Sequence, residues 1–374
     1  MTQPLRVAAF VQLGRTKNPT GVGKHINNMV AGLALTPGVR LEVAAARDEL
    51  DAGGAIPPAS ALFGLTPRPL PWRRRTLERS WRLLNWPKIE RWCGEVDWVY
   101  APGESYVATR RARFAGTLHC LMWFERDKPW GQGRSAQRVR LMMRSILRPT
   151  FKHARVIIAV SQFLKSSAVR LFGVDPNRIE VVPNGVEPEF FAAGDQPPPT
   201  PGPRPYVVAV GGLTTMKGAP HLLGLARALQ QIHCDVDILI AGHADSPYAQ
   251  EAAALANVRH LGYVGKEALP MLVRGAAAMV FPSRYETFGI PILEAMAART
   301  PVITARAAAM PEVAGEAALY LDEDRPDHTA DLVRTLLNDA GAREQFAEAG
   351  RARAELFRWD RCVARLLSVL QARR

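Results

Sequence analysis

Two glutamates separated by seven residues mark the stretch of this sequence that is best suited to chemistry. Glu286 follows the apolar run AAAMVF and the break at Pro282, whereas Glu294 lies in the helix-forming run ILEAMAA. Pro291 fits the first helical turn, because the N–H that proline lacks would have no intrahelical partner there. Gly289 precedes that turn, and it lets backbone N–H groups approach an anion at the helix N-terminus. One carboxylate is therefore expected in a loop and the other inside the helix, although the bare spacing favours two solvated glutamates.

Further candidate residues lie in loops that follow expected strands. Gly21, Val22 and Gly23 form a loop between the first strand and the first helix, which alone is weak evidence for phosphate binding. His119 lies at the carboxyl end of a strand, where an open α/β sheet places its ligand groups. A single histidine at such a position is nevertheless more often structural. Lys217 lies in the glycine-flanked loop GGLTTMKG, which also follows a strand.

Two series of alternating strands and helices carry these loops. In the first series, apolar runs predict strands at 5–13, 41–46, 96–100, 116–120, 154–160 and 178–186, with helices at 24–35, 72–93, 135–147 and after a Ser161 cap. In the second series, strands are expected at 206–210, 236–241, 258–264, 276–281 and 301–305, with helices at 221–229, 269–277, 291–298, 327–338 and 341–370 and a loop at 310–315. Pro87 is expected to interrupt the helix at 72–93, and the last helix to break near 357–359.

This rhythm predicts an α/β protein with two doubly wound, Rossmann-like domains that face each other across a central cleft. The expected domains are residues 1–192 and 206–355. The proline-dense stretch 193–205 is expected to be the linker, because it can hold neither a helix nor a central strand. The remaining residues, 356–374, are expected to form a C-terminal helix that packs back on the first domain.

Length and composition exclude several other classes of protein. A chain of 374 residues with 48% hydrophobic and 22% charged residues is long enough for two globular cores and is not typical of disorder. No run approaches the roughly 18–20 apolar residues of a membrane-spanning helix. The N-terminus lacks a signal-peptide pattern, so a cytoplasmic location is expected. The four cysteines lack C-x-x-C spacing, which argues against a disulfide framework or a zinc site.

The basic excess belongs entirely to the first half of the chain. Residues 1–190 hold 29 basic and 15 acidic residues, whereas the remaining residues hold 19 and 20. This asymmetry indicates an anionic partner, which could be a membrane surface, a phosphorylated substrate or nucleic acid. In the stretch 72–93, Leu77, Trp81 and Leu84 share a helical face surrounded by arginines. That pattern fits an interfacial membrane helix and an ordinary core-facing helix equally well.

With this order of elements, the sequence resembles a retaining glycosyltransferase of family 4, which has the GT-B architecture. The resemblance covers about half of the chain and most of the second domain. It rests on the segments VIIAVSQFLKSSAVRLFGVDPNRIEVVPNGV, VAVGGLTTMKG, ILIAG, LGYVGKEALPML, AAAMVFPSRYETFGIPILEAMAARTPVIT and MPEVAGEAALYLD. The N-terminal half matches only in outline, as expected if it binds a variable acceptor.

The resemblance implies transfer of a sugar from a nucleotide-sugar donor to an acceptor hydroxyl, with retention of configuration and without a metal or another cofactor. By this resemblance, Lys217 binds the donor diphosphate, Glu286 contacts the transferred sugar, Glu294 binds the ribose hydroxyls and His119 lies beside the scissile bond. The other donor-binding residues that it implies are Gly21, Val22 and Gly23, Gly211 and Gly212, Gly262, Tyr263 and Val264 at the base, and Thr287, Phe288, Gly289 and Ile290. Lys217, Glu286 and His119 are the expected catalytic residues.

The sequence departs from the family pattern at two of these places. Gly212 stands where members often have an arginine, which leaves more of the diphosphate charge to Lys217 and to the amides of residues 287–290. Cys120 replaces the aspartate that usually follows the histidine. The implied mechanism is front-face displacement, in which the leaving phosphate accepts the acceptor's proton and the cleft closes around the donor.

The form YETFGIPILEAMA resembles mannosyltransferase-like members of surface-polysaccharide and lipopolysaccharide assembly. We therefore expect a GDP-sugar such as GDP-mannose as donor, with a UDP-sugar as the alternative. The expected acceptor is a glycan or a polyprenyl-diphosphate-linked glycan at the inner face of the membrane. Two other readings are a nucleic-acid-binding module, which lacks any recognised binding motif, and another GT-B enzyme such as an epimerase or a phosphorylase. We expect no nucleic-acid partner, and the sequence leaves the oligomeric state open.

Overall fold

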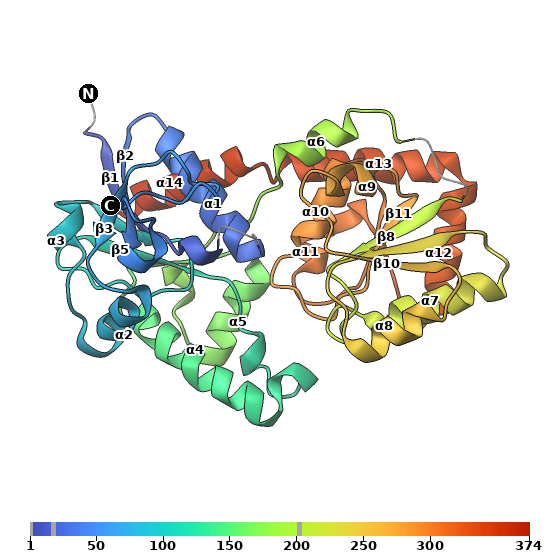
Figure 1. Ribbon diagram of the computed structural model, residues 1–374, viewed down its shortest axis with the longest axis horizontal. Coiled ribbons are helices and arrows are strands. Elements are labelled where there is room, and N and C mark those ends of the chain that lie inside the picture. The colour runs from blue at the N-terminus through green and yellow to red at the C-terminus, as the bar shows by residue number, and fades with distance from the viewer. Residues whose placement is uncertain (1–2, 16–19, 200–203) are drawn as a thin grey trace. The chain divides into compact units, whose positions relative to one another are not determined.

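The computed structural model describes residues 3–15, 20–199 and 204–374, which form two compact α/β units (Figure 1). The first unit comprises Met1–Asn184 together with Trp359–Arg374. The second unit comprises Gly185–Arg358. Each unit has its own parallel sheet covered by helices, as the alternation of strands and helices predicted.

The first unit is built on a seven-stranded parallel sheet with the order β3-β2-β1-β4-β5-β6-β7. Its inner strands are almost entirely apolar because both faces of the sheet are covered. In the centre of the sheet, Val7 pairs with Leu41 on one side and with Trp98 on the other. The strands are β1 (Leu5–Phe10), β2 (Val39–Ala46), β3 (Pro67–Leu70), β4 (Trp98–Ala101), β5 (Arg113–Leu118), β6 (Val156–Ala159) and β7 (Ile179–Val181).

The helices of this unit pack through apolar faces whose spacing is visible in the sequence. They are α1 (Gly21–Leu35), α2 (Arg74–Leu84), α3 (Glu90–Cys93), α4 (Gly133–His153), α5 (Gln162–Phe172) and α14 (Trp359–Ala372). The predicted cap of α5 is confirmed, since the Ser161 side chain accepts a hydrogen bond from the Leu164 N–H. The chain returns to this unit through α14, which packs against α1. Gly32 allows this approach, because a Cβ there would lie 2.4 Å from Val363 Cγ2.

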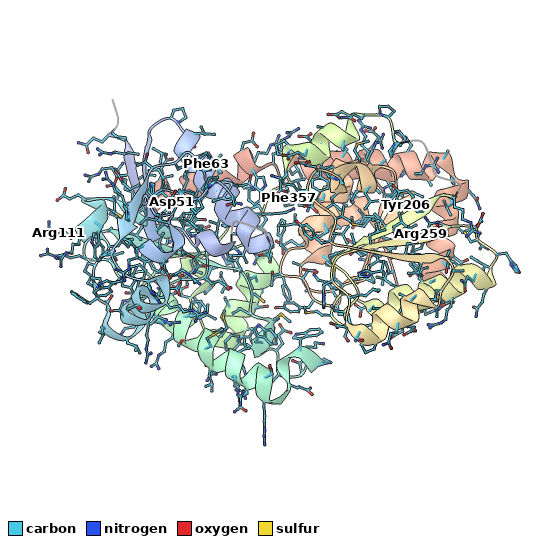
Figure 2. All side chains as sticks on the ribbon, in the orientation of Figure 1. Asp51, Phe63, Arg111, Tyr206, Arg259 and Phe357 are labelled. Carbon is cyan, nitrogen blue, oxygen red and sulfur yellow. The ribbon has the colours of Figure 1, made fainter. Side chains whose placement is uncertain are left out.

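The second unit has a six-stranded parallel sheet with the order β10-β9-β8-β11-β12-β13. Its strands are β8 (Tyr206–Val210), β9 (Asp237–Ala241), β10 (Val258–Gly262), β11 (Ala278–Phe281), β12 (Val302–Thr304) and β13 (Leu319–Tyr320). Its helices are α6 (Pro188–Gly194), α7 (Ala219–Gln231), α8 (Ser246–Ala253), α9 (Leu269–Arg274), α10 (Ile290–Ala297), α11 (Met310–Ala314), α12 (Pro326–Asn338) and α13 (Ala340–Glu355). Figure 2 labels Arg259 on β10, which pairs at 3.0 Å with the buried Asp237 of β9.

The predicted linker is wrong, because the chain passes between the units at residues 184 and 185 rather than at 193–205. Residues 188–194 form α6 and pack with α9 and α10 of the second unit. The buried rings of Phe190 and Phe191 hold α6 there, and Arg351 of α13 donates a hydrogen bond to the Phe191 carbonyl at 2.9 Å. The described prolines of the stretch, at positions 197–199 and 205, are exposed. Residues 200–203 of the predicted linker lie outside the described residues.

Three local predictions also need correction. The GVG segment is not a loop but the first turn of α1, and residues 310–314 form the helix α11 instead of a loop. Trp81 is fully buried, and its indole N–H donates to the Pro87 carbonyl at 2.7 Å. The interfacial interpretation therefore does not hold for Trp81, whose apolar helical face packs inward. Leu84, which the sequence placed on the same face, is 70% exposed.

Candidate functional site

The strand–loop–helix prediction around the two glutamates is confirmed. β11 ends at Phe281 and α10 begins at Ile290, so Glu286 lies in the connecting loop and Glu294 lies in the helix. Gly289 is the N-cap of α10 with φ 95°, a left-handed conformation that favours glycine. A backbone hydrogen bond of 3.1 Å, from the Ala309 N–H to the Glu286 carbonyl, fixes this loop. In the first turn of α10, Pro291 has no N–H, and the Ile292 N–H donates to the Gly289 carbonyl at 3.1 Å.

Lys217 and Glu286, which are 69 residues apart in the sequence, form an ion pair. Lys217 Nζ lies 2.5 Å from Glu286 Oε1, and the Ser283 hydroxyl donates to the same oxygen at 2.8 Å. The side chains are 27% and 16% exposed, so both can still meet a ligand. The fold explains the meeting, because Lys217 follows β8, Glu286 follows β11 and these strands are neighbours in the sheet. A backbone hydrogen bond of 2.8 Å from Arg284 to Met216 joins the two loops.

The glycines of the Lys217 loop are required by close backbone contacts. At Gly218, with φ 77°, a Cβ would lie 2.1 Å from the Pro282 carbonyl oxygen. At Gly212, with φ 89°, a Cβ would lie 1.9 Å from the carbonyl oxygen of His243. Lys217 itself passes over Gly211, where a Cβ would lie 3.4 Å from Lys217 Cδ. The position at which related sequences often carry an arginine therefore has no room for a side chain in this protein.

Around α10 the candidate residues are mostly buried. Glu294 is 2% exposed, Phe288 3% and Ile290 6%. The Phe288 ring packs edge-on against Phe357, which Figure 2 labels, with 5.9 Å between the ring centroids. These contacts fix the start of α10, and the ribose-binding role of Glu294 stays a prediction. The backbone amides of residues 287–290 are likewise candidates for phosphate contacts.

The expected base-binding segment lies at the end of β10, on the edge of the same sheet. Gly262 ends the strand with φ 66°, and its carbonyl accepts a 2.7 Å hydrogen bond from the Gly242 N–H. Tyr263 is 77% exposed, so its ring is available for stacking. Because the strands are parallel, this segment and Lys217 both lie at the carboxyl edge of the sheet. In the order β10-β9-β8-β11, β10 is two strands away from β8. Val264 follows in the loop after the strand.

In the first unit, His119 lies just beyond the end of β5 and is 4% exposed. Its Nε2 lies 2.7 Å from the Pro102 carbonyl oxygen, which fixes the ring by a hydrogen bond from Nε2–H. The backbone N–H groups of His119 and Cys120 both donate to Glu104 Oε1, at 3.1 and 2.9 Å. Glu104 therefore orders this turn although Cys120 replaces the usual aspartate.

A second histidine, which sequence reasoning missed, lies against His119. The rings of His25 and His119 meet edge-to-face with centroids 4.9 Å apart. His25 Nδ1 donates to Asn184 Oδ1 at 2.8 Å, and His25 Nε2 accepts from the Tyr100 hydroxyl at 3.0 Å. Burial, and then the nearby His119, lower the pKa of His25 to about 3, so the imidazole is neutral. Burial also raises the pKa of the Tyr100 hydroxyl.

The available signal for His25 was its position, since it lies immediately before Ile26 on the buried side of α1. Nothing local to it in the sequence indicates Asn184, which is 159 residues away. Gly21, Val22 and Gly23 form the first turn of the same helix, and Gly23 is buried. The N–H groups of a first helical turn have no intrahelical acceptors, so this turn can still face an anion.

Within residues 3–15, 20–199 and 204–374, no three or more His, Cys, Asp and Glu side chains gather in a way that could hold a metal ion. Over the same described residues, no helix combines the length and the apolar character needed to cross a bilayer.

Two family models match the chain, one on each half. The model "Glycosyltransferase Family 4" matches residues 19–190, and the model "Glycosyl transferases group 1" matches residues 193–353. The chain is 28% identical over 317 residues to the O-antigen chain mannosyltransferase B of Escherichia coli, covering 79% of this chain and 80% of that protein.

Solved structures agree with the fold at low sequence identity. A glycosyltransferase from Rickettsia africae superposes with a TM-score of 0.70 at 16% identity, covering 100% of this chain and 99% of that one. Anabaena HepE, solved in complex with UDP-glucose, gives a TM-score of 0.66 at 17% identity, covering 98% of this chain and all of that one.

Two Rossmann-like units, each with its own parallel sheet, give this chain the GT-B fold. The two family models together account for most of the sequence, and the chain belongs to the family 4 glycosyltransferases.

Proposed function

We propose that this protein transfers a hexose, with retention of configuration and without a metal, from a nucleotide-sugar to a glycan or lipid-linked acceptor. The observation that carries the proposal is the ion pair of Lys217 and Glu286 beside the N-terminus of α10. An ammonium group and the positive end of a helix suit a diphosphate, and a carboxylate suits sugar hydroxyls. Lys217 is thus suited to the diphosphate of a nucleotide-sugar, and Glu286 is suited to its sugar.

In the proposed reaction the bond between the anomeric carbon and the diphosphate oxygen breaks as the acceptor oxygen bonds to the same face of that carbon. The acceptor's proton passes to the departing diphosphate oxygen. Lys217 stabilises the negative charge that grows on this oxygen, and Glu286 orients the sugar. His119 contacts the sugar in the expected family arrangement. These roles extend from the family resemblance to the residues whose geometry is described above.

For the donor we propose GDP-mannose or a related GDP-sugar, with a UDP-sugar as the second candidate. The first choice is supported by the likeness to an O-antigen mannosyltransferase, and the second by a structural neighbour solved with UDP-glucose. Thermal-shift measurements with GDP, UDP and ADP test this choice, since a ligand that binds only the folded state raises its stability. GDP should give the largest shift, and a larger UDP shift would reverse the assignment.

Replacement of the paired residues tests the reaction itself. Lys217→Ala and Glu286→Ala should each lower the transfer rate by at least about 100-fold, in line with loss of one transition-state stabilising group. Arg227→Ala is the matched control, because it breaks another ion pair of the second unit, with Glu251, that lies outside the proposed site. A radiolabelled donor provides the assay, and near-normal turnover in either site variant would remove the proposal. The rate should also be the same with and without EDTA.

We further propose that the basic first unit lies at the inner face of the membrane, where a lipid-linked acceptor would be found. Three large apolar side chains lie exposed at the end of α2 and just beyond it, namely Leu83 and Leu84, each 70% exposed, and Trp86, 50% exposed. Nearby arginines of α2 are exposed as well. Exposed apolar groups among basic ones are typical of peripheral membrane contact.

Liposome flotation tests this contact. The unaltered protein should float with vesicles that contain phosphatidylglycerol, and Leu83→Ser/Leu84→Ser should float less. Phe63→Ser serves as the control because Phe63 is an exposed apolar residue, 62% exposed, outside the 72–93 stretch. Equal flotation of all three proteins, or none with any vesicle, would exclude this surface.

A further inference from the structure

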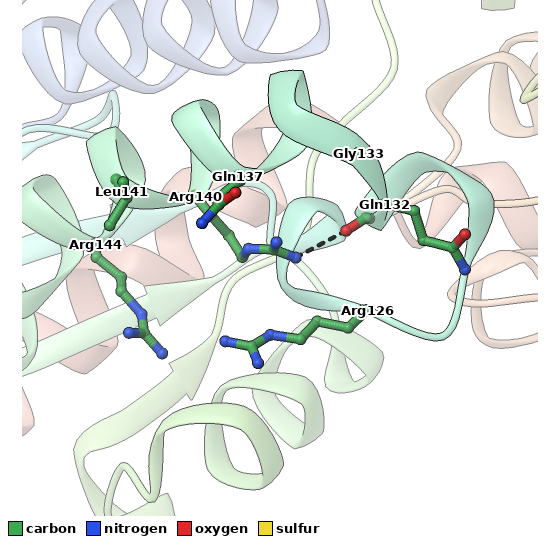
Figure 3. Close-up of a pocket in the computed structure, with 8 residues that line it drawn as sticks. Arg126, Gln132, Gly133, Gln137, Arg140, Leu141 and Arg144 are labelled. Atoms are coloured by element: carbon green, nitrogen blue, oxygen red, sulfur yellow. Dashed lines mark hydrogen bonds between the residues drawn. The ribbon is translucent and has the colours of Figure 1, made fainter.

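A pocket of about 380 Å³ lies in the first unit, between α4 and the turn that precedes it (Figure 3). This volume lies within the range of small-molecule sites. Two glycines complete a lining formed chiefly by Arg126, Gln132, Gln137, Arg140, Leu141 and Arg144. All of these lining residues belong to the first unit, whereas Lys217 and Glu286 belong to the second.

Three guanidinium groups line this pocket, and its lining contains no carboxylate. Arg140 is anchored, since its Nη1 donates to the Gly131 carbonyl at 2.8 Å, the bond drawn in Figure 3. Among the residues that the structure describes, the side chains of Arg126 and Arg144 form neither an ion pair nor a hydrogen bond. The nearby Glu125 is already paired with Arg170 at 2.9 Å. The positive charge that gathers in the pocket is therefore not neutralised by a lining carboxylate.

The helix aligns these groups by its own periodicity. Gln137, Arg140, Leu141 and Arg144 are spaced i, i+3, i+4 and i+7, so they share one face of α4. Figure 3 shows the Arg126 side chain reaching toward that face from the preceding turn. Leu141 is 63% exposed, and the adjacent Met142 is 54% exposed. The site therefore combines three cations, of which Arg140 is anchored, with an exposed apolar surface.

We propose that this arginine-lined pocket binds the phosphate or diphosphate group of an amphipathic ligand. A guanidinium group can bind phosphate through two parallel N–H···O hydrogen bonds, and it stays charged at every physiological pH. The two glutamines supply neutral donors, and the apolar pair beside them suits a hydrocarbon chain. Two sources share this chemistry, a polyprenyl diphosphate acceptor and a phospholipid headgroup. The first source rests on the proposed glycosyl transfer, whereas the phosphate site itself does not.

Calorimetric titration with inorganic pyrophosphate tests the site. The titration uses the full chain with Lys217→Ala, which removes the cation that is expected to bind the donor diphosphate. Arg126→Gln/Arg144→Gln in that background should weaken binding about 100-fold, or about tenfold for each charge-assisted contact removed. Both arginines are exposed and unpaired, so the glutamines should leave the fold intact.

The matched control is Arg134→Gln/Arg138→Gln, which removes the same charge from exposed positions of α4 outside the pocket. It should change the affinity by no more than about twofold, because exposed charges at a distance are screened by salt. Unchanged pyrophosphate binding in the pocket variant would overturn the proposal. An equal loss in both pairs would overturn it too, since that result describes a diffuse basic surface.

Vesicles then separate the two sources of phosphate. Phosphatidylcholine vesicles that carry a polyprenyl diphosphate should retain the unaltered protein and lose the pocket variant, while phosphatidylglycerol vesicles retain both. A pocket-dependent loss on phosphatidylglycerol instead assigns the site to a headgroup. A failure of the proposed glycosyl transfer would give a different result. Nucleotides would then cause no thermal shift, while pyrophosphate would still bind at the pocket.

Discussion

Acidification should destabilise the first unit through the buried His25. Its imidazole is neutral in the folded protein, with its N–H on Asn184 and its lone pair toward the Tyr100 hydroxyl. Protonation would place a second N–H against that hydroxyl and a charge in an apolar interior beside His119. The folded state therefore resists a proton that the unfolded chain accepts readily.

The magnitude follows from the two pKa values. In the unfolded chain His25 has a pKa of 6.5, and in the folded protein the pKa falls to about 3. Between these values the unfolded state binds more protons, so stability is complete above about pH 6.5 and is lost as the pH falls toward 3. At about 1.36 kcal/mol per pH unit, the loss between pH 7 and pH 5 is about 2 kcal/mol.

Tryptophan fluorescence during urea unfolding is the appropriate measurement. All eight tryptophans belong to the first unit, so the signal reports that unit and not the second. With an m-value of about 2 kcal/mol/M, the predicted loss corresponds to a midpoint about 1 M lower at pH 5 than at pH 7. Carboxylates also titrate in this range, so the comparison needs a variant without the imidazole.

His25→Gln provides that comparison, because it keeps a buried amide that can hydrogen-bond but does not titrate. The variant should be less stable than the unaltered protein at pH 7, and this deficit should shrink by about 2 kcal/mol at pH 5. A deficit that stays constant with pH would refute the reasoning. A direct check is the His25 ring resonance in NMR, which should not titrate between pH 5 and 8, and a midpoint near 6.5 would be equally decisive against it.

Two further predictions concern the packing of the first unit. Ser161→Ala removes the cap of α5 and should lower the unfolding free energy of this unit by about 1 kcal/mol, measured by urea titration. Ser161→Asp keeps a capping oxygen and should retain most of the unfolding free energy. Trp81→Ala empties a fully buried site and should cost about 3–5 kcal/mol, measured by circular dichroism. A cost below about 1 kcal/mol at Trp81 would indicate that the indole is not a core residue.

The sequence was sufficient for the elements whose signals are local. Apolar runs predicted the strands of both sheets except β3 and β13, and the proline and glycine around α10 predicted its start. Local signals were ambiguous where two environments require the same pattern. An amphipathic helix with Trp81 looks alike whether its face meets lipid or the protein core, and only the structure shows burial. The proline density of the predicted linker likewise gave no indication of where the preceding residues pack. Phe190 and Phe191 pack on the second unit, and only the structure shows this.

In the candidate site too, local patterns were predictable and long-range contacts were not. Lys217 and Glu286 were expected near one another because their loops resemble those of a known family, and the order of β8 and β11 explains their contact. The His25 cluster escaped prediction because its contacts, to residues such as Asn184, span large sequence separations. No periodicity records such contacts, since they arise only when separate strands and helices are assembled.

Gly212 shows how the structure changes the meaning of a departure from the family pattern. From the sequence alone, the missing arginine is a lost cation that a substitution could restore. In the structure, φ is 89° and a Cβ would lie 1.9 Å from the His243 carbonyl oxygen, so the backbone excludes every side chain. Gly212→Arg should therefore lower the melting temperature of the second unit and weaken GDP binding, both measured by thermal shift. Gly265→Arg is the control, because a Cβ there meets nothing within 4 Å. Tighter GDP binding by Gly212→Arg at an unchanged melting temperature would contradict this account, in which the loop depends on Lys217 for its cation.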